Sequence, residues 1–450
     1  MALFERNTGA SMHLLKTLCL AIGLMALATV PARAASLIRD ADIEYALAEL
    51  ADPILRAAGL SPAQVRVLLV NDSSLNAFVT DTQHIFIHSG LLLKLQNARS
   101  LQAVIAHEAA HITNGHLTSR AGNIASARTA AGLGLVLAAA AAAAGGGKAA
   151  PGIAIGAQSS ALRVFLGHTR AEEASADQSS VRYMVRAGVN PQGAVEVHEM
   201  FKGQEALSVS RQDPYMLSHP LNRDRMRAMQ GFVAAYGKDL PDNNAANYWF
   251  ARAQGKLSAF TRAPGWTLRR AKDSATQDIA LMRQAAAYHR QSDLKRALAA
   301  IDGALKLRPK DPFYMDLKAQ ILLESRQAGA AVSAYSQASN LAPRNALILG
   351  GLGRALLAAD RPRDALSVLE KARDRDFRDA RVLRDLAVAY AKTGSNGMAS
   401  VVTAERYALQ GRMKDAALHA DRAMALLPRG SGPWQRAQDV LLTAERAARR

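Results

Sequence analysis

Residues 101–116, LQAVIAHEAAHITNGH, are the most informative stretch for the fold of the first half of the chain. Their apolar side chains recur at helical spacing and fall largely on one face, which predicts a helix over this stretch. These side chains are Leu101, Val104, Ile105 and Ile112. The same stretch contains the pattern H-E-x-x-H. Residues four apart on a helix are rotated by about 40°, so His107 and His111 project side by side and can hold one cation.

The residue types in this pattern favour zinc. Two neutral imidazoles with an open coordination side suit that cation. Zinc lowers the pKa of a bound water to about 7, so the adjacent Glu108 can act as a general base. The alternative is a solvated helix face that happens to hold two histidines. Eight of the 11 histidines lie between His84 and His219, which favours a site.

A third protein ligand is needed, and spacing leaves several candidates. His116 follows the first histidine of the pattern by nine residues, so on a continuous helix it faces about 180° away. Glu173 and Asp177 are four apart and share a face of a second expected helix, so one can ligate while the other orients an imidazole. Glu172 points about 100° away and is expected to be a solvated charge. The spacing favours Glu173 and leaves His168 as a further candidate.

The surrounding segments predict a small sheet within a mostly helical α+β fold. Apolar spacing over 37–60 predicts a first helix. Runs rich in β-branched residues predict three short strands. The expected strands cover 65–70, 76–80 and 84–88, and further helices are expected from Gly90 and over 162–187.

Residues 1–34 have the pattern of a secretory signal peptide. A basic start precedes an apolar run over 18–30, and Ala32-Arg33-Ala34 has the form of a cleavage site. An uncleaved anchor is the alternative, although the run is short for a bilayer span. Cleavage removes Cys19, the single cysteine, so we expect an exported, soluble chain without disulfides.

Composition also predicts where the domains end. Residues 237–274 contain several proline and asparagine residues and a basic cluster, which predicts a connector between domains at 35–236 and 275–450. Residues 129–147 carry no charge and are mostly Ala and Gly. They are interpreted as a helical hairpin or, alternatively, as a flap that contacts a membrane beside the site.

From residue 277 onward the sequence repeats with a period of about 34 residues, a length typical of paired helices. Pro309 and Pro343 are one period apart, and small residues recur in two other positions. These are Ala297, Ala331 and Ala365, and Ala304, Ala338 and Ala372. The pattern resembles the tetratricopeptide repeat and predicts an all-α solenoid over 275–450. A generic helical bundle is the alternative. Pro428 is out of phase with the period, which predicts one extra helix near 399–409.

Four motifs together resemble one family of metallopeptidases, that of HtpX and the CAAX prenyl proteases. The motifs are Asn76-Ala77-Phe78-Val79, the H-E-x-x-H helix, Arg170-x-x-Glu173-x-x-Ala176-Asp177, and Ser218-His219-Pro220 followed by Arg225. With the signal sequence and the repeats, the chain is similar to the BepA-like periplasmic metalloproteases over nearly all of its mature length.

The resemblance implies a gluzincin site with one zinc ion per chain, in which Glu173 joins the two histidines as ligand and Asp177 supports a ligand. It implies that His219 and Arg225 face the cleft as catalytic residues that stabilise an oxyanion. It also implies that His219 can approach the metal in a closed resting state. A capping residue before a proline turn is the alternative for His219.

The first of the four motifs is assigned to substrate binding. Asn76, Ala77 and Phe78 resemble the family's cleft edge, where an extended substrate adds as a strand. The alternative is that these residues belong to the core of the sheet and do not contact a substrate.

The motifs and the signal sequence predict a zinc endopeptidase that acts on proteins of the bacterial envelope. The family resemblance implies a periplasmic enzyme that cleaves misfolded or stalled envelope proteins during outer-membrane protein assembly. The alternative is a chaperone-like interaction module in which proteolysis is minor or gated. A repeat array offers a concave docking surface, so both can hold together.

The net charge of +18 is concentrated in one half of the chain. Residues 241–450 hold +15 of it, whereas residues 35–240 hold +1. Export and the absence of a reader motif argue against nucleic acid. We therefore expect the repeats to favour an acidic protein partner or an anionic membrane surface.

Overall fold

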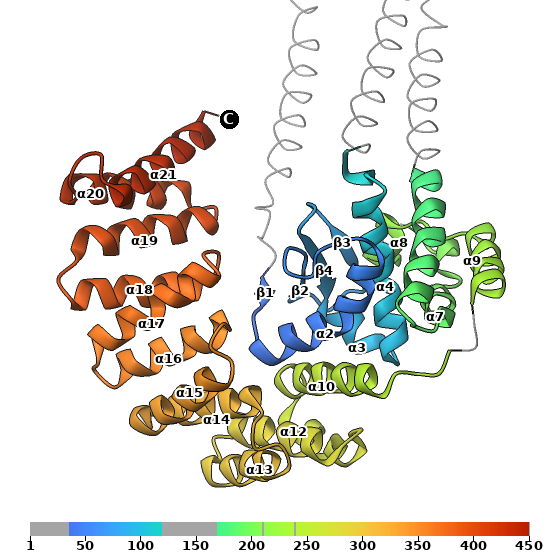
Figure 1. Ribbon diagram of the computed structural model, residues 1–450, viewed down its shortest axis with the longest axis horizontal. Coiled ribbons are helices and arrows are strands. Elements are labelled where there is room, and N and C mark those ends of the chain that lie inside the picture. Colours follow the sequence, from blue (N-terminus) through green and yellow to red (C-terminus); the bar gives the residue numbers. More distant parts are fainter. Residues whose placement is uncertain (1–35, 119–168, 209–210, 238–239, 450) are drawn as a thin grey trace, which may run out of the picture. The chain divides into compact units, whose positions relative to one another are not determined.

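The computed structural model describes residues 36–118, 169–208, 211–237 and 240–449, and its first half contains a small mixed sheet (Figure 1). The strands are β1 (Leu37–Ile38), β2 (Arg66–Val70), β3 (Ala77–Val79) and β4 (His84–His88). Their order is β1-β2-β4-β3, with β2 and β4 parallel and the other pairs antiparallel. The three predicted strands are present, and β3 lies at an edge of the sheet.

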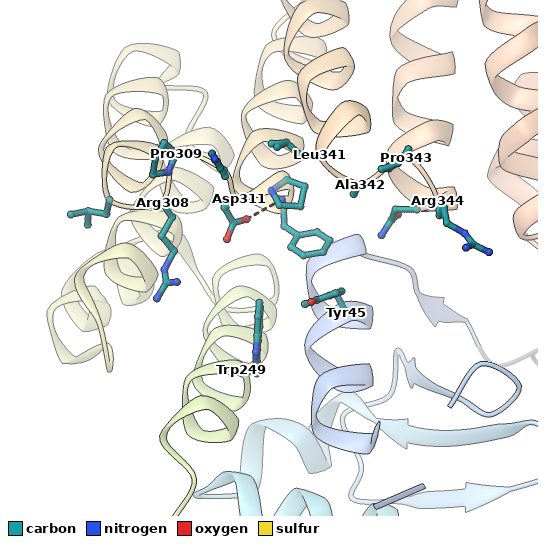
Figure 2. A pocket seen from close by; sticks show the side chains of 14 residues that line it. Tyr45, Trp249, Arg308, Pro309, Asp311, Leu341, Ala342, Pro343 and Arg344 are labelled. Atoms are coloured by element: carbon teal, nitrogen blue, oxygen red, sulfur yellow. Dashed lines mark hydrogen bonds between the residues drawn. The ribbon is translucent and has the colours of Figure 1, made fainter. Parts of the chain in front are cut away.

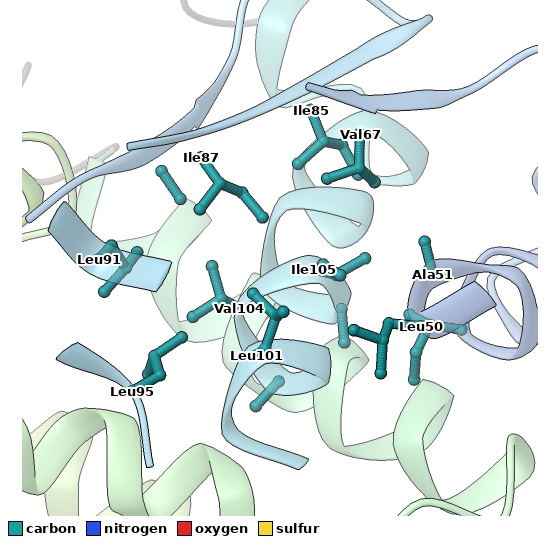
Figure 3. Close-up of a cluster of buried hydrophobic side chains, with 14 of the residues drawn as sticks. Leu50, Ala51, Val67, Ile85, Ile87, Leu91, Leu95, Leu101, Val104 and Ile105 are labelled. Carbon is teal, nitrogen blue, oxygen red and sulfur yellow. The ribbon is translucent and has the colours of Figure 1, made fainter. Parts of the chain in front are cut away.

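Helices α2 (Ala41–Ala57) and α4 (Ala98–Thr113) pack their apolar faces against this sheet (Figure 3). The predicted helix over 37–60 was too long, because its first residues pair as β1 and Asp40 then caps α2. The Asp40 carboxylate accepts hydrogen bonds from the backbone N–H groups of Asp42 and Ile43. Such a cap satisfies N–H groups that have no partner within the helix.

Helix α4 ends three residues before the predicted end. Asn114 and Gly115 follow it, and Gly115 has a φ of 72°. That left-handed conformation is readily adopted by glycine and ends many helices. The chain therefore turns before His116, which matters for the site.

Further elements complete the first domain. Residues 169–186 form a helix, which supplies part of the one predicted over 162–187. The labelled elements are α3 (Ser89–Lys94), α7 (Gln192–Met200), η1 (Gln204–Ala206), α8 (Pro214–Ser218) and α9 (Arg223–Tyr236).

The stretch predicted as a connector contains substantial helices. They are α10 (Asn244–Thr261), α11 (Pro264–Arg270) and the short η3 (Ala271–Asp273). Helix α10 contacts α2, α4 and α12, and its residues Phe250, Arg252, Lys256 and Leu257 are buried. The domain boundaries themselves remain predictions.

The second half consists of successive helix pairs (Figure 1). These are α12 (Gln277–Arg290), α13 (Leu294–Leu307), α14 (Pro312–Glu324), α15 (Ala328–Leu341), α16 (Ala346–Ala358), α17 (Pro362–Arg375), α18 (Ala380–Lys392), α19 (Asn396–Leu409), α20 (Met413–Leu426) and α21 (Gly432–Ala448). The six recurring alanines are fully buried. The fold class predicted from the sequence, α+β followed by an all-α repeat array, is therefore confirmed.

The prediction of an extra helix near 399–409 was wrong. Helix α19 begins at Asn396, one repeat period after α17 begins at Pro362, so it is the regular second helix of its pair. Pro428 is out of phase because it lies between α20 and α21, which belong to one pair, whereas Pro309 and Pro343 lie between successive pairs.

Two predicted segments, the signal peptide at 1–34 and the uncharged stretch at 129–147, lie outside the described residues. Within the described ranges, no helix combines the length and the apolar character that crossing a membrane requires.

Candidate metal centre

Helix α4 places the H-E-x-x-H residues in the interior of the first domain. Asn97 caps the helix by accepting a hydrogen bond from the backbone N–H of Ser100. His107, Glu108 and His111 follow on a helix whose described side chains are nearly all buried. The Nε2 atoms of the two histidines lie 3.1 Å apart. The side-by-side placement expected from their spacing is therefore present.

The helix over 169–186 brings a carboxylate to both imidazoles. Oε2 of Glu173 lies 3.2 Å from Nε2 of His107, and Oε1 lies 3.4 Å from Nε2 of His111. Glu173 itself is only 1% exposed. Of the acidic residues that the spacing argument compared, Glu173 is the one that faces both histidines.

His219 closes the group from the end of α8. Its Nδ1 lies 3.3 Å from Nε2 of His107 and 3.0 Å from Oε2 of Glu173. Its Nε2 lies 3.3 Å from both Oε1 of Glu108 and the carbonyl oxygen of Ala77. Burial lowers the pKa of His219, but the charges of Glu173 and Glu108 outweigh burial and raise the pKa to about 10. Because a ligating imidazole must give up this proton, metal binding at Nδ1 would release it.

Four buried donor atoms thus converge, and they fit a tetrahedral zinc ion. The ligand atoms of His107, His111, Glu173 and His219 all lie within 4.8 Å of one another. In a tetrahedral site with bonds of about 2.0–2.1 Å, neighbouring ligand atoms lie about 3.3 Å apart. The five distances above, 3.0–3.4 Å, are close to that value, with Glu173 meeting the two histidines of helix α4 through different oxygens. Nitrogen and carboxylate donors in this number are those that zinc takes in proteins.

Residues 38–233 match the sequence profile of peptidase family M48, and residues 322–395 match that of a tetratricopeptide repeat. Residues 38–233 form a peptidase family M48 domain. The family and the repeat domain recognised in the sequence are therefore confirmed, and the protein is a zinc metallopeptidase with a tetratricopeptide-repeat domain.

Relatives match most of this chain. The beta-barrel assembly-enhancing protease of Escherichia coli (strain K12) is 24% identical over 372 residues, which cover 81% of this chain and 73% of that protein. The putative beta-barrel assembly-enhancing protease of Vibrio cholerae serotype O1 is 24% identical over 385 residues, which cover 81% and 76%. The chain is thus a distant homologue of these proteases.

A second set of contacts in the M48 domain orients the first histidine. Oδ1 of Asp177 lies 3.2 Å from Nδ1 of His107, as the spacing allowed. Arg225 donates two hydrogen bonds of 2.8 Å to the Asp177 carboxylate. Burial raises the pKa of Asp177, but Arg225 and then His107 oppose burial and hold the pKa well below its usual range. A carboxylate that stays ionised can keep the proton of His107 on Nδ1 and its Nε2 free to ligate.

The position of Arg225 differs from its expected role at the cleft. Its side chain is 7% exposed, and Nη1 donates to the carbonyl oxygen of Pro220 at 2.9 Å while the other two nitrogens bind Asp177. Nη1 also lies 3.3 Å from Oε2 of Glu173. Contact with both carboxylates suits a positioning residue. The oxyanion role remains a prediction.

One residue near the M48 site, His198, was missed, and two others, His116 and Glu172, were misplaced. Nδ1 of His116 lies 2.9 Å from Nδ1 of His111, because the turn at Gly115 breaks the continuous helix on which the prediction of an opposite-facing side chain rested. The dipeptide Asn114-Gly115 is a helix-ending signal that could have revealed this. Nε2 of His198 lies 3.6 Å from Asp177. Glu172 is 8% exposed, so the expectation of a solvated charge was wrong.

The predicted substrate-binding residues border the site at strand β3. Phe78 stacks on Phe86 of β4 at 5.3 Å, and the backbone oxygen of Asn76 accepts from the N–H of His88 at 2.9 Å. Ala77 contacts His219 through its carbonyl oxygen. The motif therefore joins the sheet edge to the metal centre. Its substrate contacts remain a prediction.

Proposed function

We propose that the protein is a zinc endopeptidase in which His107, His111 and Glu173 hold one ion per chain. The observation that carries this proposal is the four-donor cluster with Glu108 beside it. When bound, zinc supplies Lewis acidity that acidifies water and polarises a substrate carbonyl. Glu108 takes a proton from the attacking water and returns it to the leaving amine.

His219 makes the proposed site a closed one. If its Nδ1 joined the other three donors on a bound ion, no coordination position would be left for water or a substrate carbonyl, and a catalytic zinc site needs such a position. A substrate must therefore displace His219. Once displaced, its imidazole is available to stabilise an oxyanion, as the family resemblance implies. The resemblance implies the same role for Arg225, whose three side-chain nitrogens are held by Asp177 and Pro220 while the site is closed. Movement of His219 also frees the carbonyl oxygen of Ala77, at the edge of β3, to accept a main-chain hydrogen bond from an extended substrate.

The relatives and the N-terminal sequence support a proposal for the substrates and the compartment. We infer that residues 1–34 export the chain to the periplasm, where its cationic repeats draw it toward the membrane surface. The relatives are named for enhancing beta-barrel assembly. We therefore propose misfolded or stalled envelope proteins as substrates and quality control of outer-membrane protein assembly as the role, with the repeats as docking module.

A chaperone-like function with gated proteolysis is the second candidate. The specific observation in its favour is that the chain's own side chains supply four potential ligand atoms, as many as a closed tetrahedral site would take. In that case the repeat array binds unfolded envelope proteins while the metal centre stays closed and cleaves little.

The Glu108→Gln variant separates the two candidates. If Glu108 is the general base, this isosteric variant keeps zinc at the wild-type level by metal analysis and loses casein cleavage by about 100-fold or more. An active Glu108→Gln variant would overturn the assignment of Glu108. A wild-type protein that retains zinc but cleaves neither casein nor envelope proteins would favour the chaperone-like function.

A further inference from the structure

A hollow in the described residues lies away from the metal centre, at the turns that join successive repeats (Figure 2). It has a volume of about 940 Å³. One wall is the turn between α13 and α14, a second is the turn between α15 and α16, and Tyr45 of α2 and Trp249 of α10 complete it. We call this hollow the turn pocket. Its two turns occupy equivalent positions in consecutive repeats.

Aromatic and aliphatic side chains line the turn pocket. The ring of Tyr45 lies 5.1 Å from that of Trp249 and 4.8 Å from that of Phe313. Leu307 and Leu341 stand at the turns and are 54% and 42% exposed. Grouped apolar side chains that remain accessible mark interaction sites on soluble proteins. The hollow is large enough to bury an aromatic or branched aliphatic side chain of a partner.

The rim of the turn pocket carries cations without counter-ions. Lys310 and Arg344 hold the same position in consecutive repeats, both are exposed, and neither forms an ion pair with any residue that the structure describes. Arg308 on the same rim differs, because its Nε lies 2.6 Å from Asp278. Asp311 likewise is paired with Arg252. Two positive charges are thus left to interact with a partner.

We propose that the turn pocket docks an acidic polypeptide segment of a protein partner. The segment inserts one aromatic or large aliphatic side chain against Tyr45, and its flanking carboxylates pair with Lys310 and Arg344. Complementary charge at a rim guides association, while a buried apolar anchor supplies most of the affinity. This inference deepens the proposed docking role of the repeats and names its surface.

The shape of the surface favours a polypeptide over a lipid bilayer. A bilayer could contact the rim cations, but its flat surface would leave a hollow of about 940 Å³ unfilled. Tyr45, Trp249 and Phe313 line that hollow, and their neighbouring rings suit a single inserted side chain.

A charge-reversal pair tests the proposal in the full mature chain with Glu108→Gln, so that bound peptides are not cleaved. The probe is a short fluorescein-labelled peptide in which Glu and Asp flank a central Phe. The Lys310→Glu/Arg344→Glu variant should bind this probe about tenfold more weakly in fluorescence anisotropy. The matched control is Lys414→Glu/Arg429→Glu, which makes the same charge change at exposed positions near α20. It should shift the dissociation constant by less than about twofold.

Additional binding measurements distinguish an acidic peptide from a lipid surface as the ligand of the turn pocket. A probe with Gln and Asn in place of Glu and Asp keeps the Phe anchor but loses the ion pairs, so it should bind the wild-type pocket about as weakly as the acidic probe binds the charge-reversal variant. Binding of the acidic probe should fall as salt rises. Equal losses in both variants, or no loss in either, would overturn the proposal. So would a result in which the variant loses only co-sedimentation with phosphatidylglycerol vesicles and keeps the peptide.

The same variants distinguish failure of docking from failure of the proposed protease function. Restored to Glu108, Lys310→Glu/Arg344→Glu should cleave casein at the wild-type rate, because no rim residue contacts the metal centre. Loss of peptide binding with intact cleavage supports the turn pocket. Absence of cleavage in the wild type would count against the protease while leaving the binding result valid.

Discussion

His116 holds the ring nitrogen of His111 that points away from the proposed metal, and this contact predicts a measurable effect on affinity. Its Nδ1 lies 2.9 Å from Nδ1 of His111. Partners that orient a ligating histidine typically contribute about 10–100-fold to metal affinity. We expect His116→Ala to weaken zinc binding by about tenfold in a chelator competition assay. His289→Ala, which removes a histidine from the repeats, is the control and should leave zinc affinity unchanged. Equal affinity in His116→Ala and wild type would show that the contact does not orient His111.

A second prediction at this scale concerns the fourth donor. Cobalt(II) in place of zinc reports its ligands through its visible spectrum. If Nδ1 of His219 occupies a coordination position, His219→Ala should alter this spectrum while one ion per chain remains bound, because three donors persist. An unaltered spectrum would place His219 outside the coordination sphere. His198→Ala is the control, since its Nε2 lies 3.6 Å from Asp177 and it is not one of the four donors.

At the residue scale, the sequence could reveal contacts that helical spacing determines. The neighbours His107 and His111, and the shared face of Glu173 and Asp177, follow from residues four apart on a helix. His116 could not be placed in this way, because one glycine with positive φ redirects the chain. His219 lies far from the pattern in the sequence, and only the family resemblance connected the two.

At the scale of elements, helix α14 carries a carboxylate whose ionisation should affect stability. Burial raises the pKa of Asp316 to about 7, and Asp40 and Asp42 add to this while Lys256 and Arg381 oppose it. Between about pH 4 and 7 the native chain holds a proton that the unfolded chain has lost, so native stability falls as the pH rises through this range. Asp316→Asn removes this dependence. The quantity to measure is the thermal midpoint of Asp316→Asn minus that of wild type. We expect this difference to be about 3 °C larger at pH 8 than at pH 5.

The control for this pH dependence is Asp439→Asn on α21, an exposed carboxylate. Its difference from wild type should be the same at both pH values. If Asp316→Asn behaves like this control, Asp316 is already ionised in the native protein at pH 5, and its burial among acidic neighbours has little energetic effect.

Elements with a clear period were predictable, and elements defined by a partner were not. The strands β2 and β4 have enough β-branched residues to be recognised alone. Strand β1 has two residues, too few for any alternation, and exists because Leu37 and Ile38 pair with Val70 and Leu69. The error at α19 had another cause, since Pro428 was aligned with prolines that occupy a different turn of the repeat.

At the scale of the whole molecule, α10 joins the M48 domain to the repeats through a buried arginine. Arg252 is fully buried, and its Nε lies 2.7 Å from Asp42 of α2. Its Nη1 and Nη2 bind Asp311, which caps α14, at 2.5 and 2.9 Å. The guanidinium also lies 3.9 Å from the ring centroid of Tyr314. The composition of residues 237–274 predicted a linker. The contacts that make α10 part of the core join residues far apart in the sequence, so local composition could not reveal them.

Removing this arginine should therefore weaken the connection between the two halves. Arg252→Met leaves the buried carboxylate of Asp42 without a main counter-charge, and breaking such a pair costs about 3–5 kcal/mol. Repeat arrays gain stability from neighbouring units, so the first repeats lose most when α14 is released. We expect calorimetry to show an unfolding transition that is lowered or split in Arg252→Met. Arg56→Met breaks a solvent-exposed pair with Asp52, which contributes little to stability, and should unfold like wild type. A single unchanged transition in Arg252→Met would mean that Lys256, 3.0 Å from Asp40, and the apolar contacts of α10 hold the halves together without it.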